Sequence, residues 1–136
     1  MSMTFNEFQE LSKRTMPLHM ANLPHDEDME VTIKGEVMML SELTRSVAIS
    51  NYSMGLEGEA GEVTDLLKKV YHHGHTMSRE ELEKEFGDVL HYLSGLAEFH
   101  GIKLGNAATR NIEKLKNRFP NGFNKEDSIN RNEEEE

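Results

Sequence analysis

The sequence of 136 residues contains no cysteine, no tryptophan and only three prolines. The absence of cysteine excludes disulfides, thiolate metal sites and a cysteine nucleophile. No apolar run approaches the roughly 20 residues that cross a bilayer, and the first residues lack a basic segment followed by an apolar one. We therefore expect a cytoplasmic protein with no membrane partner, and the length predicts a single domain.

Basic residues are few beside acidic ones, with 15 Lys and Arg against 25 Asp and Glu, which gives a net charge of −10. Proteins bind a nucleic-acid backbone through Lys and Arg that displace counterions, so this balance argues against a nucleic-acid partner. Residues 124–136 contain six acids, two bases and one large apolar residue, Ile129. Such a segment cannot bury enough surface to offset its ordering entropy. We expect a disordered acidic tail after a domain formed by residues 1–123.

Four stretches of the chain show helical periodicity. The first and third open with capping boxes, Thr4-x-x-Glu7 and Ser78-x-x-Glu81, which satisfy free backbone N–H groups at a helix start. The sequence between 51 and 58 favours a bend or an interruption in the second stretch. The predicted helices cover about residues 4–16, 41–73, 78–100 and 104–118.

The segment from Pro17 to about Leu40 fits no regular helical pattern. It contains two prolines and a run, Val31 to Met38, that is consistent with a small hairpin or with a mobile loop. Elsewhere the connections between the helical stretches are short. Amphipathic helices joined in this way predict an all-α domain of the four-helix-bundle type, with an irregular insertion after the first helix.

Two of the predicted helices each carry a pair of acids three residues apart. Residues at this spacing lie on the same side of a helix, about one turn apart. In both pairs the first acid follows a leucine of the apolar stripe by three residues, so both pairs should lie toward the bundle interior. The four acids are Glu59 and Glu62 in the second helix, and Glu85 and Asp88 in the third.

Carboxylates near an interior need a positive partner, because desolvating an ionised group costs several kcal/mol. Taken alone, either pair is better explained as solvated surface charge that interacts with Lys or Arg. Two pairs on consecutive helices, both on the apolar side, instead favour a shared cation. Oxygen ligands without cysteine suit Mg²⁺ or Mn²⁺, and protein-bound Mg²⁺ commonly contacts a few carboxylates, waters and substrate phosphates.

These acids lie in segments that resemble the MazG-like all-α nucleoside triphosphate pyrophosphohydrolases. The resemblance covers about residues 54–119, and the helix Phe5–Thr15 looks like the family's leading helix. The matching segments are Gly55–Lys69, Glu83–Leu93, Gly101-Ile102 and Asn111–Phe119. The family motifs Glu-x-x-Glu and Glu-x-x-Asp correspond to the two acid pairs.

The resemblance implies cleavage between the α and β phosphates of a nucleoside triphosphate, with Mg²⁺ required. It assigns Glu59, Glu62, Glu85 and Asp88 to metal binding and catalysis, with one of them as a candidate general base. It also implies assembly into a homodimer or homotetramer that completes the bundle. Some relatives carry an additional Glu before each motif, where this chain has Gly58 and Lys84, so the number of metal ions stays open.

By the same resemblance, Lys114 and Arg118 of the fourth helix contact the triphosphate, with Asn111 as a polar neighbour. Both basic residues can equally be explained by their position near the C-terminus of the helix, where positive charge balances the helix dipole. Other candidates favour ordinary roles. We expect His72, His73 and His75, together with Lys68 and Lys69, to be solvated, and Tyr92 to pack in the core.

Two other functions compete with this hypothesis. A di-iron carboxylate bundle requires two Glu-x-x-His motifs, whereas this sequence offers only Asp88-x-x-His91. An acidic interaction protein, such as a DNA mimic, would suit the net charge and the acidic tail. Such a protein would spread its acids over the surface, whereas here four acids are expected beside apolar stripes.

Overall fold

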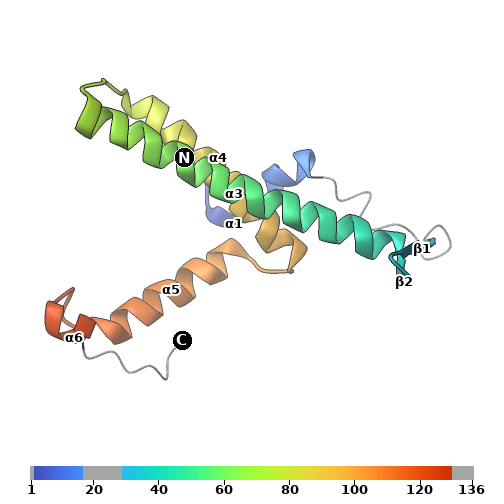
Figure 1. The fold of residues 1–136 in the computed structure, drawn as a ribbon. Coiled ribbons are helices and arrows are strands. Elements are labelled where there is room, and N and C mark those ends of the chain that lie inside the picture. Colours follow the sequence, from blue (N-terminus) through green and yellow to red (C-terminus); the bar gives the residue numbers. More distant parts are fainter. Residues whose placement is uncertain (1, 17–28, 130–136) are drawn as a thin grey trace.

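The computed structural model describes residues 2–16 and 29–129. Helices dominate it, which confirms the all-α prediction (Figure 1). The predicted bounds of the fourth helix, 104–118, agree with the structure. The predicted bounds of the other three helices differ from the structure by a few residues at their ends. The elements are α1 (Phe5–Ser12), a 3₁₀ turn (Lys13–Thr15), β1 (Glu30–Ile33), β2 (Glu36–Met39), α3 (Leu40–His73), α4 (Arg79–Phe99), α5 (Leu104–Arg118) and α6 (Lys125–Ile129).

Both capping boxes form as predicted. The backbone N–H of Ser78 donates to Glu81 Oε2 at 2.6 Å, and the Glu81 N–H donates back to Ser78 Oγ at 3.1 Å. Thr4 and Glu7 make the same reciprocal pair at 2.7 and 3.2 Å. These local bonds satisfy backbone donors that a helix start leaves free, which explains why α1 and α4 begin where they do.

Helix α3 is continuous over 34 residues, so the interruption considered between 51 and 58 is absent, and Figure 1 shows no sharp bend in the helix. A helix of this length extends about 51 Å. It ends at Gly74, whose φ of 73° is the left-handed conformation that commonly closes helices. The glycines in its middle do not break it, because α4 packs along this part of the helix and stabilises it.

The segment before α3 forms an antiparallel hairpin, the first of the two alternatives predicted for it. Strands β1 and β2 pair with Ile33 opposite Glu36. The two turn residues between them, Lys34 and Gly35, both have positive φ, as type I′ hairpin turns require. The Leu40 N–H donates to the Met29 carbonyl at 2.7 Å, which ties the hairpin to the start of α3. The earlier part of the predicted insertion, 17–28, lies outside the described residues.

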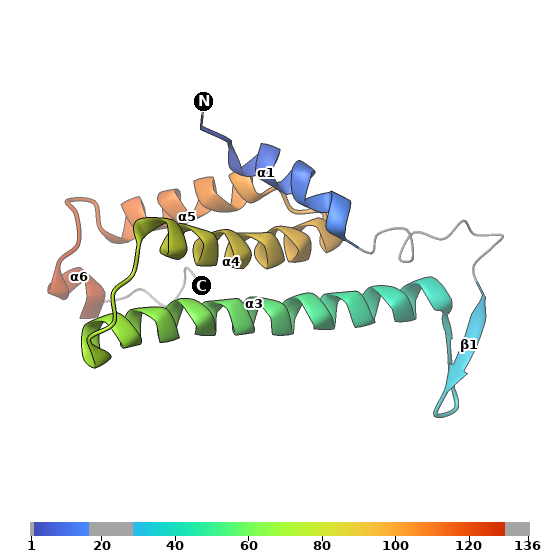
Figure 2. The ribbon, with the colours of Figure 1, turned by 90° about the horizontal axis from the view of Figure 1, so that it is seen from above.

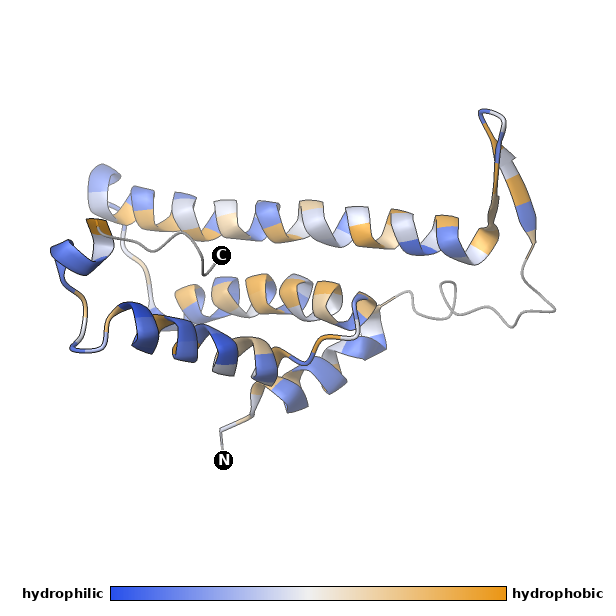
Figure 3. Ribbon diagram, turned by 90° about the horizontal axis from the view of Figure 1, so that it is seen from below, coloured by the Kyte–Doolittle hydropathy of each residue, from blue (hydrophilic) through white to orange (hydrophobic). Residues whose placement is uncertain are grey.

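Helix α4 lies between α3 and a second layer formed by α1 and α5. Figure 2 shows α3 and α4 running side by side in opposite directions, with α1 and α5 on the other side of α4. Figure 1 shows α5 diverging from α3. Hydrophobic residues predominate on the visible side of α4 in Figure 3, whereas α5 is mainly hydrophilic. None of the helices in the described ranges is long and apolar enough for crossing a membrane.

A buried glutamine joins the second layer to α4. Gln9 is 1% exposed, and its Nε2 donates to the Ile102 carbonyl at 2.8 Å and to a Glu98 carboxylate oxygen at 3.2 Å. Its Oε1 accepts the first free N–H of α5, from Leu104, at 2.9 Å. The amide therefore satisfies its own polar atoms while it holds α1 against the junction of α4 and α5. An ion pair between Lys13 and Glu98 at 2.9 Å supports the same contact.

The core formed by the described residues is small. Its main cluster consists of the buried residues Met16, Ala48, Tyr52 and Phe99, in which the Tyr52 and Phe99 rings pack edge-on. Several large apolar side chains of α4 and α5 are not covered by this core. Their exposed fractions are 48% for Phe86, 40% for Leu93, 51% for Ile112 and 39% for Leu115. The single chain therefore leaves part of the predicted bundle interior open to solvent.

The segment from residue 124 onward, predicted as a disordered tail, contains helical residues near its start. They form the short helix α6, and Asn124 caps it by accepting the Asp127 N–H on its Oδ1 at 2.7 Å. Acids in the first turn of α6 interact favourably with the helix dipole, which composition alone does not reveal. Residues 130–136 of the predicted tail lie outside the described residues.

Candidate functional site

The antiparallel pairing of α3 and α4 sets which residues lie at the same level. Tyr52 packs against Gly95, and Gly55 packs against Tyr92. Each step forward along α3 is thus matched by an equal step backward along α4. Continuing by four residues brings Glu59 to the level of Asp88. One further step of three residues brings Glu62 to the level of Glu85.

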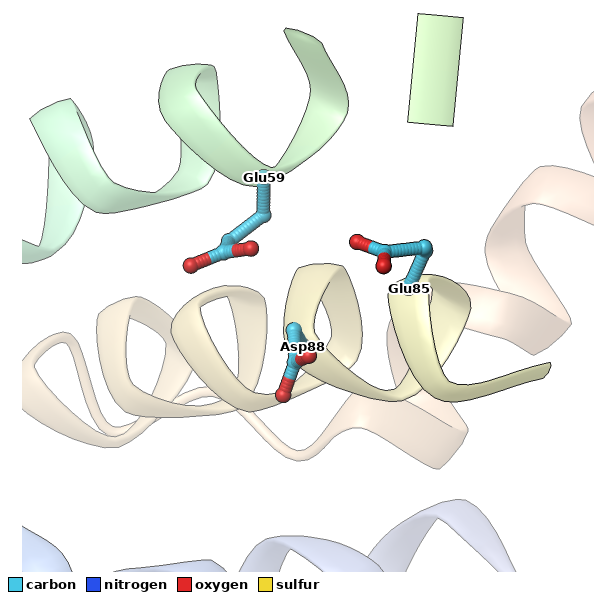
Figure 4. A group of neighbouring side chains, drawn as sticks. All are labelled: Glu59, Glu85 and Asp88. Carbon is cyan, nitrogen blue, oxygen red and sulfur yellow. The ribbon is translucent and has the colours of Figure 1, made fainter. Parts of the chain in front are cut away.

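Three of the four predicted acids come together between these helices. Glu59, Glu85 and Asp88 each offer a carboxylate oxygen, and these oxygens all lie within 4.8 Å of one another. Figure 4 shows the Glu59 carboxylate of α3 facing the α4 residues that carry the other two. Glu59 and Glu85 are half-buried, whereas Asp88 is exposed. The three-acid cluster formed by these residues is therefore open to solvent on one side.

The fourth predicted acid lies beside the cluster without joining it. Glu62 is exposed, and its charge raises the pKa of Glu59. The helical spacing predicted that it shares a side of α3 with Glu59, but not how far its carboxylate lies from the other oxygens. Among the described residues, the structure thus brings together Glu59, Glu85 and Asp88, with Glu62 at the margin.

The cluster has an unbalanced negative charge. The pKa of Glu59 is raised above its usual range, first by desolvation and then by the charges of Glu62, Asp88 and Glu85. His91 opposes this rise. The described Lys and Arg side chains form their ion pairs elsewhere, and none of these pairs includes one of the four acids. The alternative explanation was that these acids are solvated surface charges that interact with Lys or Arg. No ion pair in the described part of the chain supports it.

A divalent cation fits this donor set. Two oxygens bound to one ion at the Mg²⁺ or Ca²⁺ distances of about 2.0–2.6 Å are at most about 4–5 Å apart. Three carboxylate oxygens within 4.8 Å of one another can therefore hold one ion after closing in by less than about 1 Å. All three donors are hard oxygens, which suit Mg²⁺, Mn²⁺ or Ca²⁺ better than softer metals. The open side leaves room for water or for substrate phosphates, as Mg²⁺ sites usually do.

Aromatic rings adjoin the cluster, and the sequence predicted only part of this arrangement. Tyr92 packs on Gly55 of α3, in agreement with its predicted packing role. The Tyr52 ring lies 5.3 Å from the Tyr92 ring and 5.9 Å from the His91 ring, measured between centroids. Tyr52 was missed because a lone tyrosine in a long helix gives no signal by itself. The signal available was its spacing of three residues before Gly55, matched by Tyr92 and Gly95 in α4.

The predicted substrate contacts on α5 lie away from the cluster within this chain. Asn111 and Lys114 are exposed, and Arg118 is half-buried. Figures 1 and 2 show their helix on the far side of α4 and diverging from α3. The structure therefore does not bring these three residues to the acids in the single chain.

The remaining candidates behave as ordinary surface residues. His72, His73 and His75 are exposed at the end of α3, and the described groups that can share a metal do not include them. Lys68 and Lys69 are also exposed, and Lys69 pairs with Asp65 at 2.7 Å. The predictions that these residues are solvated are confirmed.

Comparisons with known proteins identify the family to which the chain belongs. Residues 48–123 match the family model of the MazG nucleotide pyrophosphohydrolase domain. The chain is also 35% identical, over 78 residues, to the Gene 37 protein of Mycobacterium phage L5. That alignment covers 54% of this chain and 68% of the phage protein, whose name states no activity. No solved structure matches.

The family match spans α3 from Ala48, α4 and α5, and so contains both helices that supply the three-acid cluster. It covers more than half of the chain, and the two acid motifs lie inside it. The chain therefore belongs to the MazG nucleotide pyrophosphohydrolase domain family.

Proposed function

We propose that this chain is a Mg²⁺-dependent nucleoside triphosphate pyrophosphohydrolase. It would cleave the bond between the α and β phosphates of ribo- or deoxynucleoside triphosphates in the cytoplasm, releasing a monophosphate and pyrophosphate. The observation that carries the proposal is the cluster of Glu59, Glu85 and Asp88, whose oxygens lie within 4.8 Å of one another. Membership of the pyrophosphohydrolase family supports the type of reaction.

The charge of the site explains why the substrate and a cation go together. A nucleoside triphosphate brings about four negative charges at neutral pH, which three clustered carboxylates repel at short range. When bound, Mg²⁺ neutralises phosphate oxygens and lowers the pKa of an attacking water. The acidic cluster is then suited to a substrate that it would otherwise exclude.

The positions of the four acids indicate their roles in metal binding and proton transfer. Glu59 from α3 and Glu85 and Asp88 from α4 would hold the cation from two sides, because their carboxylates lie close together between the two helices. Glu62, exposed at the margin, is the fourth acid that we assign to metal binding. One of these carboxylates accepts the proton of the attacking water, as general bases with a suitable position do. Manganese, which accepts the same oxygen donors, should also support the reaction.

Phosphate oxygens that the cation leaves uncovered need donors from the protein. Lys114 and Arg118, with Asn111 one turn earlier, are the donors that we assign to this role. In the single chain α5 points away from the cluster. The assignment therefore requires either a movement of α5 or an assembly in which α5 of a second copy approaches the acids.

A homo-oligomer would also cover the open apolar surface. Soluble monomers rarely expose large contiguous apolar patches, yet side chains such as Phe86 and Ile112 are about half exposed in the isolated chain. The core of buried residues is small for a chain of this length. We propose a homodimer or homotetramer in which helices pack across copies and complete the bundle.

The product pattern tests the proposed reaction. Purified protein with Mg²⁺ is incubated with each canonical nucleoside triphosphate, and the products are separated by anion-exchange chromatography. We expect monophosphate and pyrophosphate. Asp88→Asn should lower kcat/KM at least about 100-fold, since even outer-shell changes around a metal cost 10–100-fold. Glu83→Gln, an exposed acid on α4 that pairs with Arg79, is the matched control and should retain activity. Orthophosphate with a diphosphate product would contradict the proposed bond.

A further inference from the structure

Two tyrosines pack on two glycines where α3 crosses α4. A Cβ built on Gly55 would lie 2.6 Å from Tyr92 Cζ and closer still to Cε1. A Cβ built on Gly95 would lie 3.3 Å from Tyr52 Cζ and again closer to Cε1. Carbon atoms in contact are normally about 3.5–4.0 Å apart. Each helix thus inserts a ring into a place that only the missing side chain of a glycine leaves open.

The Tyr92 ring has little freedom to move aside. Its centroid lies 5.3 Å from that of Tyr52 and 5.3 Å from that of His91, with interplanar angles of 66° and 75°. Tyr52 in turn packs edge-on against Phe99, at a centroid distance of 5.5 Å. A side chain at position 55 would therefore push the helices apart instead of displacing one free ring.

This contact is one turn from the three-acid cluster. Gly55 precedes Glu59 by four residues on α3, and Tyr92 follows Asp88 by four residues on α4. One turn of α-helix is about 5.4 Å and transmits displacement as a stiff element. A change in the separation of the helices at the Gly55–Tyr92 contact must change the distance between Glu59 and Asp88.

We propose that the Gly55–Tyr92 contact is a positioning element that sets the spacing of the acids and makes the site favour Mg²⁺ over the larger Ca²⁺. The inference rests on the proposed function, because it assumes that the acids bind a cation. Mg²⁺ takes oxygens at about 2.0–2.1 Å, and Ca²⁺ takes them at about 2.3–2.6 Å. Relieving the 2.6 Å contact with Tyr92 Cζ, and the still closer one with Cε1, requires at least about 1 Å of movement. That movement exceeds the difference between the two ions.

The same helix contains a matched control. A Cβ on Gly58 would meet no atom within 4 Å, so Gly58→Ala adds a methyl group and helix propensity without touching α4. It lies one residue before Glu59, closer in sequence to the acids than Gly55 does. Any general effect of alanine in this part of α3 should therefore appear in Gly58→Ala as well.

Isothermal titration of the full chain with Mg²⁺ alone and with Ca²⁺ alone measures the preference as the ratio of the two affinities. We expect Gly55→Ala to shift this ratio at least about fivefold toward Ca²⁺, and Gly58→Ala to leave it unchanged. Far-UV circular dichroism verifies that each variant is folded. Equal losses of both affinities in Gly55→Ala would overturn the inference, since a purely structural defect does not discriminate between ions.

A second pair of variants gives the same test without an added clash. Tyr92→Phe keeps the ring and should keep the Mg²⁺ preference, whereas Tyr92→Leu removes the spacer and should weaken it. An unchanged ratio in Tyr92→Leu would contradict the positioning role. If the unaltered protein bound neither ion, the proposed metal site itself would fail. A wild-type protein that prefers Mg²⁺, with variants of unchanged ratio, would refute only the present inference.

Discussion

Glycine-to-alanine changes at two positions of α4 should have opposite effects on stability. Gly95 is buried, and an added Cβ would meet the ring of Tyr52, which is 4% exposed. At Gly87, eight residues earlier on the same helix, an added Cβ would meet no atom within 4 Å. The pair thus separates the clash from the helix propensity that both changes share.

The magnitude follows from two opposing contributions. Alanine is about 0.8–1.0 kcal/mol more favourable than glycine inside a helix. Overpacking a well-packed core costs about 1–3 kcal/mol. Tyr52 belongs to the buried cluster with Phe99, Met16 and Ala48, which limits relaxation. Gly87→Ala should therefore raise the free energy of unfolding by up to about 1 kcal/mol. Gly95→Ala should change it by about 0 to −2 kcal/mol.

Urea unfolding followed by far-UV circular dichroism measures this difference. Both variants and the unaltered protein are compared in EDTA and at one protein concentration, because cations and assembly would shift the apparent stability. The expected gap between the two variants is about 1–3 kcal/mol. If Gly95→Ala stabilised the protein as much as Gly87→Ala, the close approach of α3 and α4 at Tyr52 would be refuted.

Three further predictions concern charge, capping and assembly. Because the pKa of Glu59 is raised, the cation-free protein should lose stability as pH rises through that pKa. Glu59→Gln should unfold at a higher temperature than the unaltered protein at pH 7 but not at pH 3, where both forms are neutral. Ser78→Ala removes the acceptor of the Glu81 N–H and should cost about 1 kcal/mol in urea unfolding. Ile112→Asp should shift sedimentation of the protein toward the monomer, and an unchanged sedimentation coefficient would exclude this part of α5 from the interface.

Local features of the fold were predictable from the sequence because their causes are local. The Ser78 box contains both its donors and its acceptors within four residues, so the start of α4 could be predicted. The burial of Gln9 could not be predicted. Its partners, Glu98 and Leu104, lie 89 and 95 residues away in the sequence. An isolated glutamine in an amphipathic helix is normally assigned to the surface.

The candidate site likewise has features that the sequence predicts and features that depend on tertiary packing. Helical spacing predicted that Glu85 and Asp88 share a side of α4, and the apolar stripe indicated which side. The approach of Glu59 depends on the register between α3 and α4, which the sequence encodes in the paired glycines and tyrosines. The direction of α5, and with it the place of Lys114, depends on tertiary packing through Gln9 and on any neighbouring copy. Sequence periodicity does not contain that information.

The hairpin at the start of α3 lies far from the three-acid cluster of its own chain. Glu59 follows Leu40 by nineteen residues of continuous helix, a path of about 28 Å at 1.5 Å per residue. A side chain on β1 or β2 cannot reach a nucleotide held at the acids of the same molecule across that span. On the proposed function, a mutation in the hairpin should therefore not directly alter turnover at the acids of the same molecule, and a direct contact between the hairpin and a bound nucleotide would require a neighbouring copy.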